Sequence, residues 1–163
     1  MKRGSTIFLK VVIVLIGIVT LAVMIRFPLT EGRAVNLDLF SIYSDPFIVY
    51  GYLASIPFFV ALYQAFKLLG YIGQNKVFSL NSVKALRTIK YCAIALSILI
   101  VMAAIYIRLS FSVKSVTDDD PAGFIAVALV ATFISVVIAT AAAVFEKLLQ
   151  SAVDIKSEND LTV

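Results

Sequence analysis

The chain has 163 residues, of which 61% are hydrophobic and 15% are charged, and its mean hydropathy is +1.02. A soluble domain is closer to half apolar and a quarter charged, and one small core cannot bury such an excess of apolar side chains. The composition therefore excludes an ordinary soluble domain. It predicts a single all-α integral membrane domain over residues 1–163, since apolar segments cross a bilayer as helices.

The charge and the residue types limit the chemistry further. A net charge of +4 is compatible with nucleic acid, but the basic residues flank apolar runs and are not interleaved with aromatic side chains. We therefore expect a lipid bilayer as partner and no direct contact with nucleic acid. The chain has no histidine and one cysteine, Cys92, which removes the commonest metal ligand and excludes an internal disulfide.

The first apolar run predicts a membrane span over about residues 7–27, with Lys10 reaching to the interface. Basic residues precede this run, so a cleaved signal peptide is the alternative. Met24 stands where the cleavage pattern wants a small residue, which favours a retained span.

The second span is predicted over about residues 46–69. Asp45 followed by Pro46 is typical of a helix N-cap and first helical position. Pro57 lies inside the span and predicts a kink. Aromatic residues gather near its first end, as in an interfacial belt: Tyr43, Phe47, Tyr50 and Tyr52.

The segment 67–90 contains five basic residues and no acidic one, and it separates two long apolar runs. Gly70–Asn75 indicates a helix end and turn, and Ser79 or Asn81 is a candidate N-cap for the next helix. Val83, Leu86 and Ile89 then recur at a spacing of three. This spacing predicts a short amphipathic helix, lying near the lipid headgroups, between the second and third spans.

Two further spans are predicted, over about residues 90–108 and 122–146. Between them lie three adjacent aspartates, Asp118–Asp120. A cation site is one interpretation of this run, but the spaced ligands and glycine of a calcium loop are missing, so acidic caps for the next helix are favoured. A tail over residues 147–163 comes after the last span, and its final residues are polar.

Small residues recur every fourth position along the fourth span: Ala131, Ser135, Ala139 and Ala143. Such a stripe lets helices pack closely in lipid, so we expect it to contact another helix of the same chain or of a second copy in a homo-oligomer. A pore lining is the competing interpretation, which would require strongly polar groups at mid-depth.

The distribution of basic residues predicts the orientation in a bacterial inner membrane. Ten of the 14 basic residues belong to the N-terminus, the second loop and the tail, and four belong to the first and third loops. Because basic residues accumulate on the cytoplasmic side, we expect both termini in the cytoplasm.

No pattern typical of an active site is present. The middle of each predicted span lacks Asp, Glu, Lys and Arg, which are usual in proton- or ion-coupled carriers. We therefore expect no enzymatic activity, no cofactor and no metal site.

Two segments carry a resemblance to a known family: YIGQNKVFSLNSVKALRTIKYCAI in the centre, and DDDPAGFIAVALV followed by LLQSAVDIKSENDLTV at the end. The chain resembles the bacterial membrane family called domain of unknown function 2975. The resemblance implies four spans and no established activity. It also implies a link to a small helix-turn-helix regulator of the Cro/C1 type, since such regulators are often encoded beside members.

The preferred functional hypothesis is a non-enzymatic binding or regulatory module, accessory to such a regulator or to another membrane protein. A transport or channel component, and protection against membrane-active peptides, are the alternatives. The predicted interaction face combines residues of the central segment and the tail: Asn75, Phe78, Ser79, Lys84, Arg87, Lys90, Glu158, Asn159 and Asp160.

Overall fold

The structure, a computed structural model, describes residues 3–30, 43–113 and 122–160. These residues form four long α-helices: α1 (Arg3–Thr30), α3 (Pro46–Gly73), α4 (Leu80–Val113) and α5 (Ala122–Asp160). They include no strand, and each of the four helices is long and apolar enough to cross a membrane. The predicted all-α class with four transmembrane helices is confirmed.

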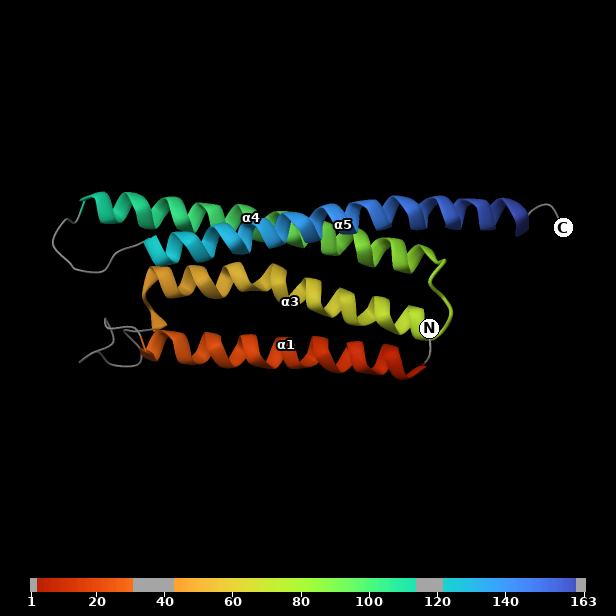
Figure 1. Cartoon of the computed structure of the whole chain (residues 1–163), viewed down its shortest axis with the longest axis horizontal. Helices are drawn as coiled ribbons and strands as arrows, with labels where there is room; N and C mark the ends of the chain where they lie inside the picture. The colour runs from red at the N-terminus through yellow and green to blue at the C-terminus, as the bar shows by residue number, and fades with distance from the viewer. Residues whose placement is uncertain (1–2, 31–42, 114–121, 161–163) are drawn as a thin grey trace.

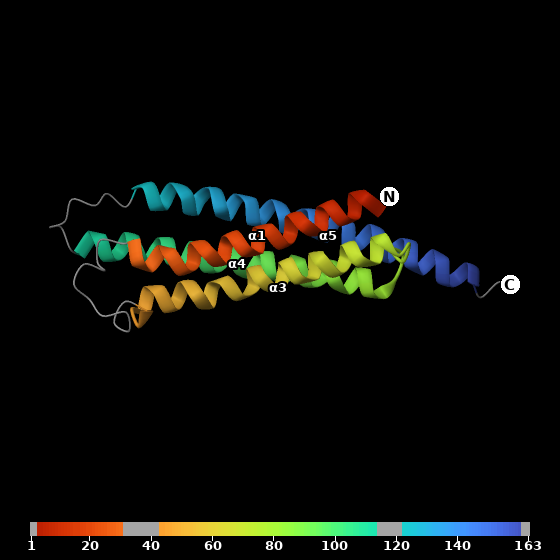
Figure 2. The same ribbon diagram turned by 90° about the horizontal axis from the view of Figure 1, so that it is seen from below.

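The four helices run side by side along the long axis of the molecule (Figures 1 and 2), and α1 lies at one edge in the view of Figure 1. Each packs mainly on its neighbour in the chain, α1 on α3, α3 on α4 and α4 on α5. The starts of α1 and α4 and the ends of α3 and α5 lie at the same end of the bundle (Figure 1). We call this the basic end; it carries Lys10, Lys67, Lys76, Lys84, Arg87, Lys90, Lys147 and Lys156.

Small side chains fill the helix contacts, and large apolar ones face outward. The buried residues of α5 include Ala128, Ser135, Ala139 and Ala142, whereas Val127 and Phe133 are each 69% exposed. In water this arrangement would be unstable, but in lipid the apolar side chains gain nothing from burial against each other. Close backbone approach through small residues then provides the packing.

The start of α3 has the predicted cap. Asp45 has an extended backbone, its carboxylate accepts a hydrogen bond of 2.8 Å from the backbone N–H of Phe47, and Pro46 is the first helical residue. Proline suits this position because its missing N–H would have no partner inside the helix. The helix continues through Pro57 to Gly73.

A second proline explains a contact between α1 and α3. Pro28 lies inside α1, and because it lacks an N–H, the carbonyl of Met24 four residues earlier has no donor within the helix. The hydroxyl of Tyr52 in α3 donates to that carbonyl at 3.0 Å. Tyr43 likewise donates to the carbonyl of Ile25 at 3.1 Å. Two of the tyrosines predicted to form an interfacial belt therefore also join α1 to the start of α3.

The predicted short amphipathic helix between the second and third spans is wrong. Helix α4 runs without interruption from Leu80 to Val113, and the apolar residues of the predicted amphipathic helix are packed inside the bundle rather than against lipid. Val83 is 2% exposed and Leu86 is 9% exposed. Their spacing does mark an apolar helix face, but α3 and α5 flank α4 and cover it.

Helix α5 is the longest, with 39 residues, and its last part extends beyond the other helices at the basic end (Figure 1). The predicted spans 7–27, 46–69, 90–108 and 122–146 all lie within the four helices. Helices α1 and α4 extend beyond their predicted spans at both ends, and α3 and α5 extend beyond theirs at the C-terminal end. The segment from residue 147 to Asp160, which belongs to the predicted tail, is helical.

Candidate functional site

An ion cluster joins α4 to α5 at the basic end. Arg87 Nε donates to one carboxylate oxygen of Glu146 and Lys90 Nζ to the other, each at 2.7 Å. Glu146 is buried, and the Arg87 side chain is half exposed. Two charge-assisted hydrogen bonds compensate the burial of the carboxylate and hold the two helices at a defined axial position.

The connection from α3 to α4 is a compact turn with a defined cap at each side. Asn75 has a positive φ of 56°. The backbone N–H of Lys76 donates to the carbonyl of Tyr71, and that of Asn75 donates to the carbonyl of Ile72. This is a Schellman motif, in which asparagine is the most common substitute for glycine at the left-handed position.

Ser79 immediately precedes α4, and its hydroxyl accepts a hydrogen bond of 3.4 Å from the backbone N–H of Ser82. It therefore occupies the N-cap position, as one of the two sequence candidates. Ser82 is fully buried, and its hydroxyl donates to the carbonyl of Lys76. These bonds make the connection part of the folded bundle.

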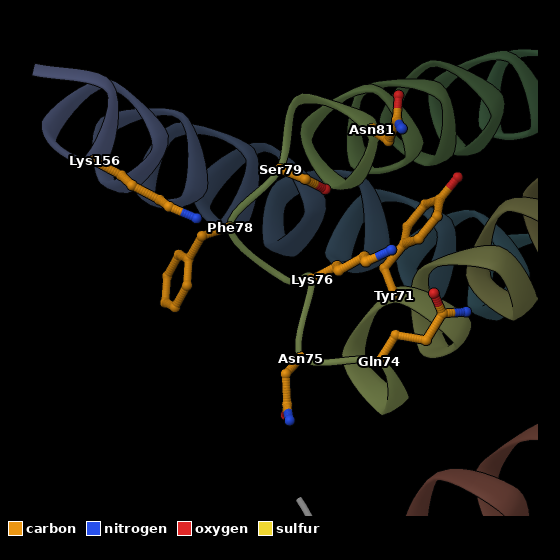
Figure 3. Close-up of a pocket in the computed structure, with 8 residues that line it drawn as sticks. All are labelled: Tyr71, Gln74, Asn75, Lys76, Phe78, Ser79, Asn81 and Lys156. Atoms are coloured by element: carbon orange, nitrogen blue, oxygen red, sulfur yellow. The ribbon is translucent and has the colours of Figure 1, made fainter. Parts of the chain in front are cut away.

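A groove of about 340 Å³ opens beside this connection. The end of α3, the connection, the start of α4 and the extension of α5 all contribute to it (Figure 3). Most of its lining residues are of polar type, and they include two lysines from different elements and no carboxylate: Tyr71, Gln74, Asn75, Lys76, Phe78, Ser79, Asn81 and Lys156. The Phe78 side chain is 57% exposed.

The predicted interaction face divides into three parts. Arg87 and Lys90 form the ion cluster with Glu146. Asn75, Phe78 and Ser79 line the groove. The remaining predicted residues lie elsewhere on the basic end: Lys84 is exposed on α4, Glu158 and Asn159 are exposed near the end of α5, and Asp160 is the last residue of that helix.

The predicted interaction face does not include Glu146 of the ion cluster or five of the groove residues: Tyr71, Gln74, Lys76, Asn81 and Lys156. Glu146 marks only the end of the predicted fourth span, although an acidic residue between an apolar run and a lysine is a signal for an interhelical ion pair. Lys156 contributes only to the charge count for orientation, and it enters the groove because α5 stays helical well beyond the predicted span.

The predicted packing stripe lies on a covered side of α5. Ser135 and Ala139 are buried, and Ala131 and Ala143 are half-buried. Helix α4 is the main neighbour of α5, so this chain itself provides a helix for the stripe to pack on.

The described residues contain no candidate metal centre. Across the residues that the structure describes, no three His, Cys, Asp or Glu side chains gather as a metal site requires. The predicted cation alternative at Asp118–Asp120 lies outside the described residues.

Comparisons with known proteins place the chain in a family. The family model described as "Protein of unknown function (DUF2975)" matches residues 29–163. The chain is 49% identical to the "Uncharacterized membrane protein YoaS" of Bacillus subtilis (strain 168), and the match covers all of both chains. No solved structure matches. The chain therefore belongs to the DUF2975 family and is a small multi-pass membrane protein with four apolar helices.

Proposed function

We propose that this protein is a non-enzymatic binding module that holds a partner at the cytoplasmic face of the bacterial inner membrane. Its basic end, with both termini, faces the cytoplasm, in agreement with the excess of basic residues there. No catalytic residue or cofactor is assigned.

The observation that carries the proposal is the extension of α5. A helix of 39 residues is about 58 Å long, whereas the hydrocarbon layer is only about 30 Å thick. The fourteen residues after Glu146 project about 21 Å beyond the ion cluster. Within this projection Leu148 is 62% exposed and Ile155 is 65% exposed.

Leu148 is only two residues past Glu146, but Ile155 lies nine residues, or about 13–14 Å, past it and outside the headgroup layer of about 5–8 Å, so lipid does not account for the exposure of Ile155. Exposed apolar surface on a part of a protein that faces water is a common mark of a protein interaction site. The family resemblance points to a small helix-turn-helix regulator as the partner. Such a regulator would be held at the membrane through the α5 extension.

Capture of the tagged protein from native membranes tests the proposal. Three forms are compared: the full chain, a chain without residues 157–163, and the variant Leu148→Ser/Ile155→Ser. Ser151→Ala/Ser157→Ala serves as a control with changes in the same exposed stretch.

We expect the full chain and the control to capture the same cytoplasmic protein. The chain without residues 157–163 and the variant Leu148→Ser/Ile155→Ser should capture little or none of it. Identical partner lists from all four forms would overturn the proposal. A regulator that is absent from every list would exclude that partner, and capture of a different protein through the same residues would leave binding as the function.

A further inference from the structure

We propose that the groove beside the α3–α4 connection binds an acidic segment of a cytoplasmic protein. This inference rests on the proposed function and names the chemistry of the partner. The groove is lined by Tyr71, Gln74, Asn75, Lys76, Phe78, Ser79, Asn81 and Lys156.

The charge of the groove comes from two lysines that belong to different elements. Lys76 lies in the connection and Lys156 in α5, about 80 residues later in the chain (Figure 3). Neither lysine forms an ion pair with another residue that the structure describes. By contrast, Arg87 and Lys90 both bind the carboxylate of Glu146. The two groove lysines thus have no carboxylate partner among the described residues.

The nearest acidic side chains on α5 do not line the groove. Asp154 accepts a hydrogen bond of 2.9 Å from the side-chain amide of Gln150, and Glu158, although close in sequence to Lys156, is likewise absent from the lining. An incoming carboxylate therefore meets no acidic residue of the groove itself. Complementary charge of this kind directs an association and selects its partner.

The remaining lining residues suit a peptide. The side-chain amides of Gln74, Asn75 and Asn81 can donate to and accept from peptide groups. Phe78, which is 57% exposed, lies on the side of the groove that Lys156 forms (Figure 3). It offers an apolar contact of the aromatic type that is enriched in protein interfaces. In a segment with alternating acidic and apolar residues, the acidic side chains match the two lysines and the apolar side chains match Phe78.

The position of the groove favours a protein over a lipid headgroup. Asn81 precedes Arg87 by six residues and Lys90 by nine, and Lys156 follows Glu146 by ten, so along their helices Asn81 lies about 9–14 Å and Lys156 about 15 Å from the ion cluster. The headgroup layer is only about 5–8 Å thick on each side. With the cluster at the hydrocarbon edge, where charged side chains belong, the groove lies beyond the headgroups.

The test uses the full chain in nanodiscs of neutral phosphatidylcholine and a fluorescent synthetic peptide that alternates Asp with Leu and Phe. A peptide with Lys in place of Asp is the control ligand. Lys76→Glu/Lys156→Glu reverses the charge of the groove, and Lys84→Glu/Lys147→Glu makes the same change in charge at exposed positions outside it. Fluorescence anisotropy gives the dissociation constants, and the melting temperature confirms that each variant is folded.

We expect the acidic peptide to bind at least about tenfold more tightly than the basic one, and Lys76→Glu/Lys156→Glu to weaken it by about tenfold or more. Lys84→Glu/Lys147→Glu should change binding less than about twofold. Equal losses in the two double variants, or equal binding of the two peptides, would overturn the inference.

The outcome is separable from that of the capture experiment. If capture from membranes depends on Leu148 and Ile155 but the groove variants capture the partner normally, the binding module stands and the acidic segment is rejected. If the tail variants capture normally as well, the proposed function itself is rejected.

Discussion

At the residue scale, Glu146 is the side chain with the largest consequences for the fold. It is buried between α4 and α5, and each of its carboxylate oxygens accepts from a different basic residue. Removing one partner of such a cluster leaves the other charges uncompensated. The resulting loss of stability exceeds the stability that an exposed ion pair contributes.

We expect Glu146→Gln to lower the free energy of unfolding by about 1–3 kcal/mol, because it removes the negative charge and leaves Arg87 and Lys90 close together. Thermal unfolding in nanodiscs measures this loss. Lys147→Gln, which changes the neighbouring exposed charge, should have an effect below about 0.5 kcal/mol. An equal effect of the two substitutions would mean that the cluster does not stabilise the bundle.

The hydrogen bond from Tyr52 to Met24 allows a second prediction at this scale. Tyr52→Phe should destabilise the protein by about 1 kcal/mol, since the carbonyl freed by Pro28 loses its donor. In a Pro28→Ala background the helix supplies its own N–H, and the same substitution should cost much less. A double-mutant cycle on unfolding measures the coupling, and purely additive effects would contradict this role of Tyr52.

At the element scale, the connection between α3 and α4 decides where the groove lies. Its Schellman motif ends α3 and its serine cap begins α4, so only a few residues separate two antiparallel helices. The family resemblance includes Asn75, Phe78 and Ser79. The structure gives two of these residues a local role, a left-handed turn position and an N-cap, beside their place in the groove.

We expect Asn75→Ala to destabilise the bundle by about 1 kcal/mol, because alanine tolerates a positive φ poorly. Asn75→Gly should be neutral or slightly stabilising at the same position. The two variants can be compared by their melting temperatures. If glycine destabilises as much as alanine, the side chain of Asn75 matters for a contact rather than for the turn.

At the scale of the whole molecule, the prediction concerns orientation. Both helix ends nearest the termini lie at the basic end (Figure 1), and the distribution of basic residues predicts that this end faces the cytoplasm. Single cysteines in a Cys92→Ala background test this with a maleimide that does not cross membranes.

Ser44→Cys, at the opposite end of the bundle, should react in intact cells. Lys84→Cys should react only after the cells are permeabilised. The reverse pattern would mean that the basic end faces outward, and the proposed cytoplasmic partner would then be excluded.

The all-α class, the four membrane-crossing helices and the cap of α3 could be predicted from the amino-acid sequence alone. These features depend on local composition, apolar length and residues adjacent in the chain, such as Asp45 and Pro46. They are predictable because a bilayer requires every crossing segment to satisfy its own backbone.

Three other features needed the packed helices: the first turns of α4 lie inside the bundle, Arg87 and Lys90 are paired with Glu146, and Lys156 reaches the groove. An apolar stripe such as Val83 and Leu86 has the same spacing whether lipid acyl chains or a neighbouring helix cover it. Likewise, a basic residue counts equally for topology whether it is free or paired with a residue more than fifty positions away. Which of these holds depends on where α5 lies against α4, and that is a property of packing between segments distant in the sequence.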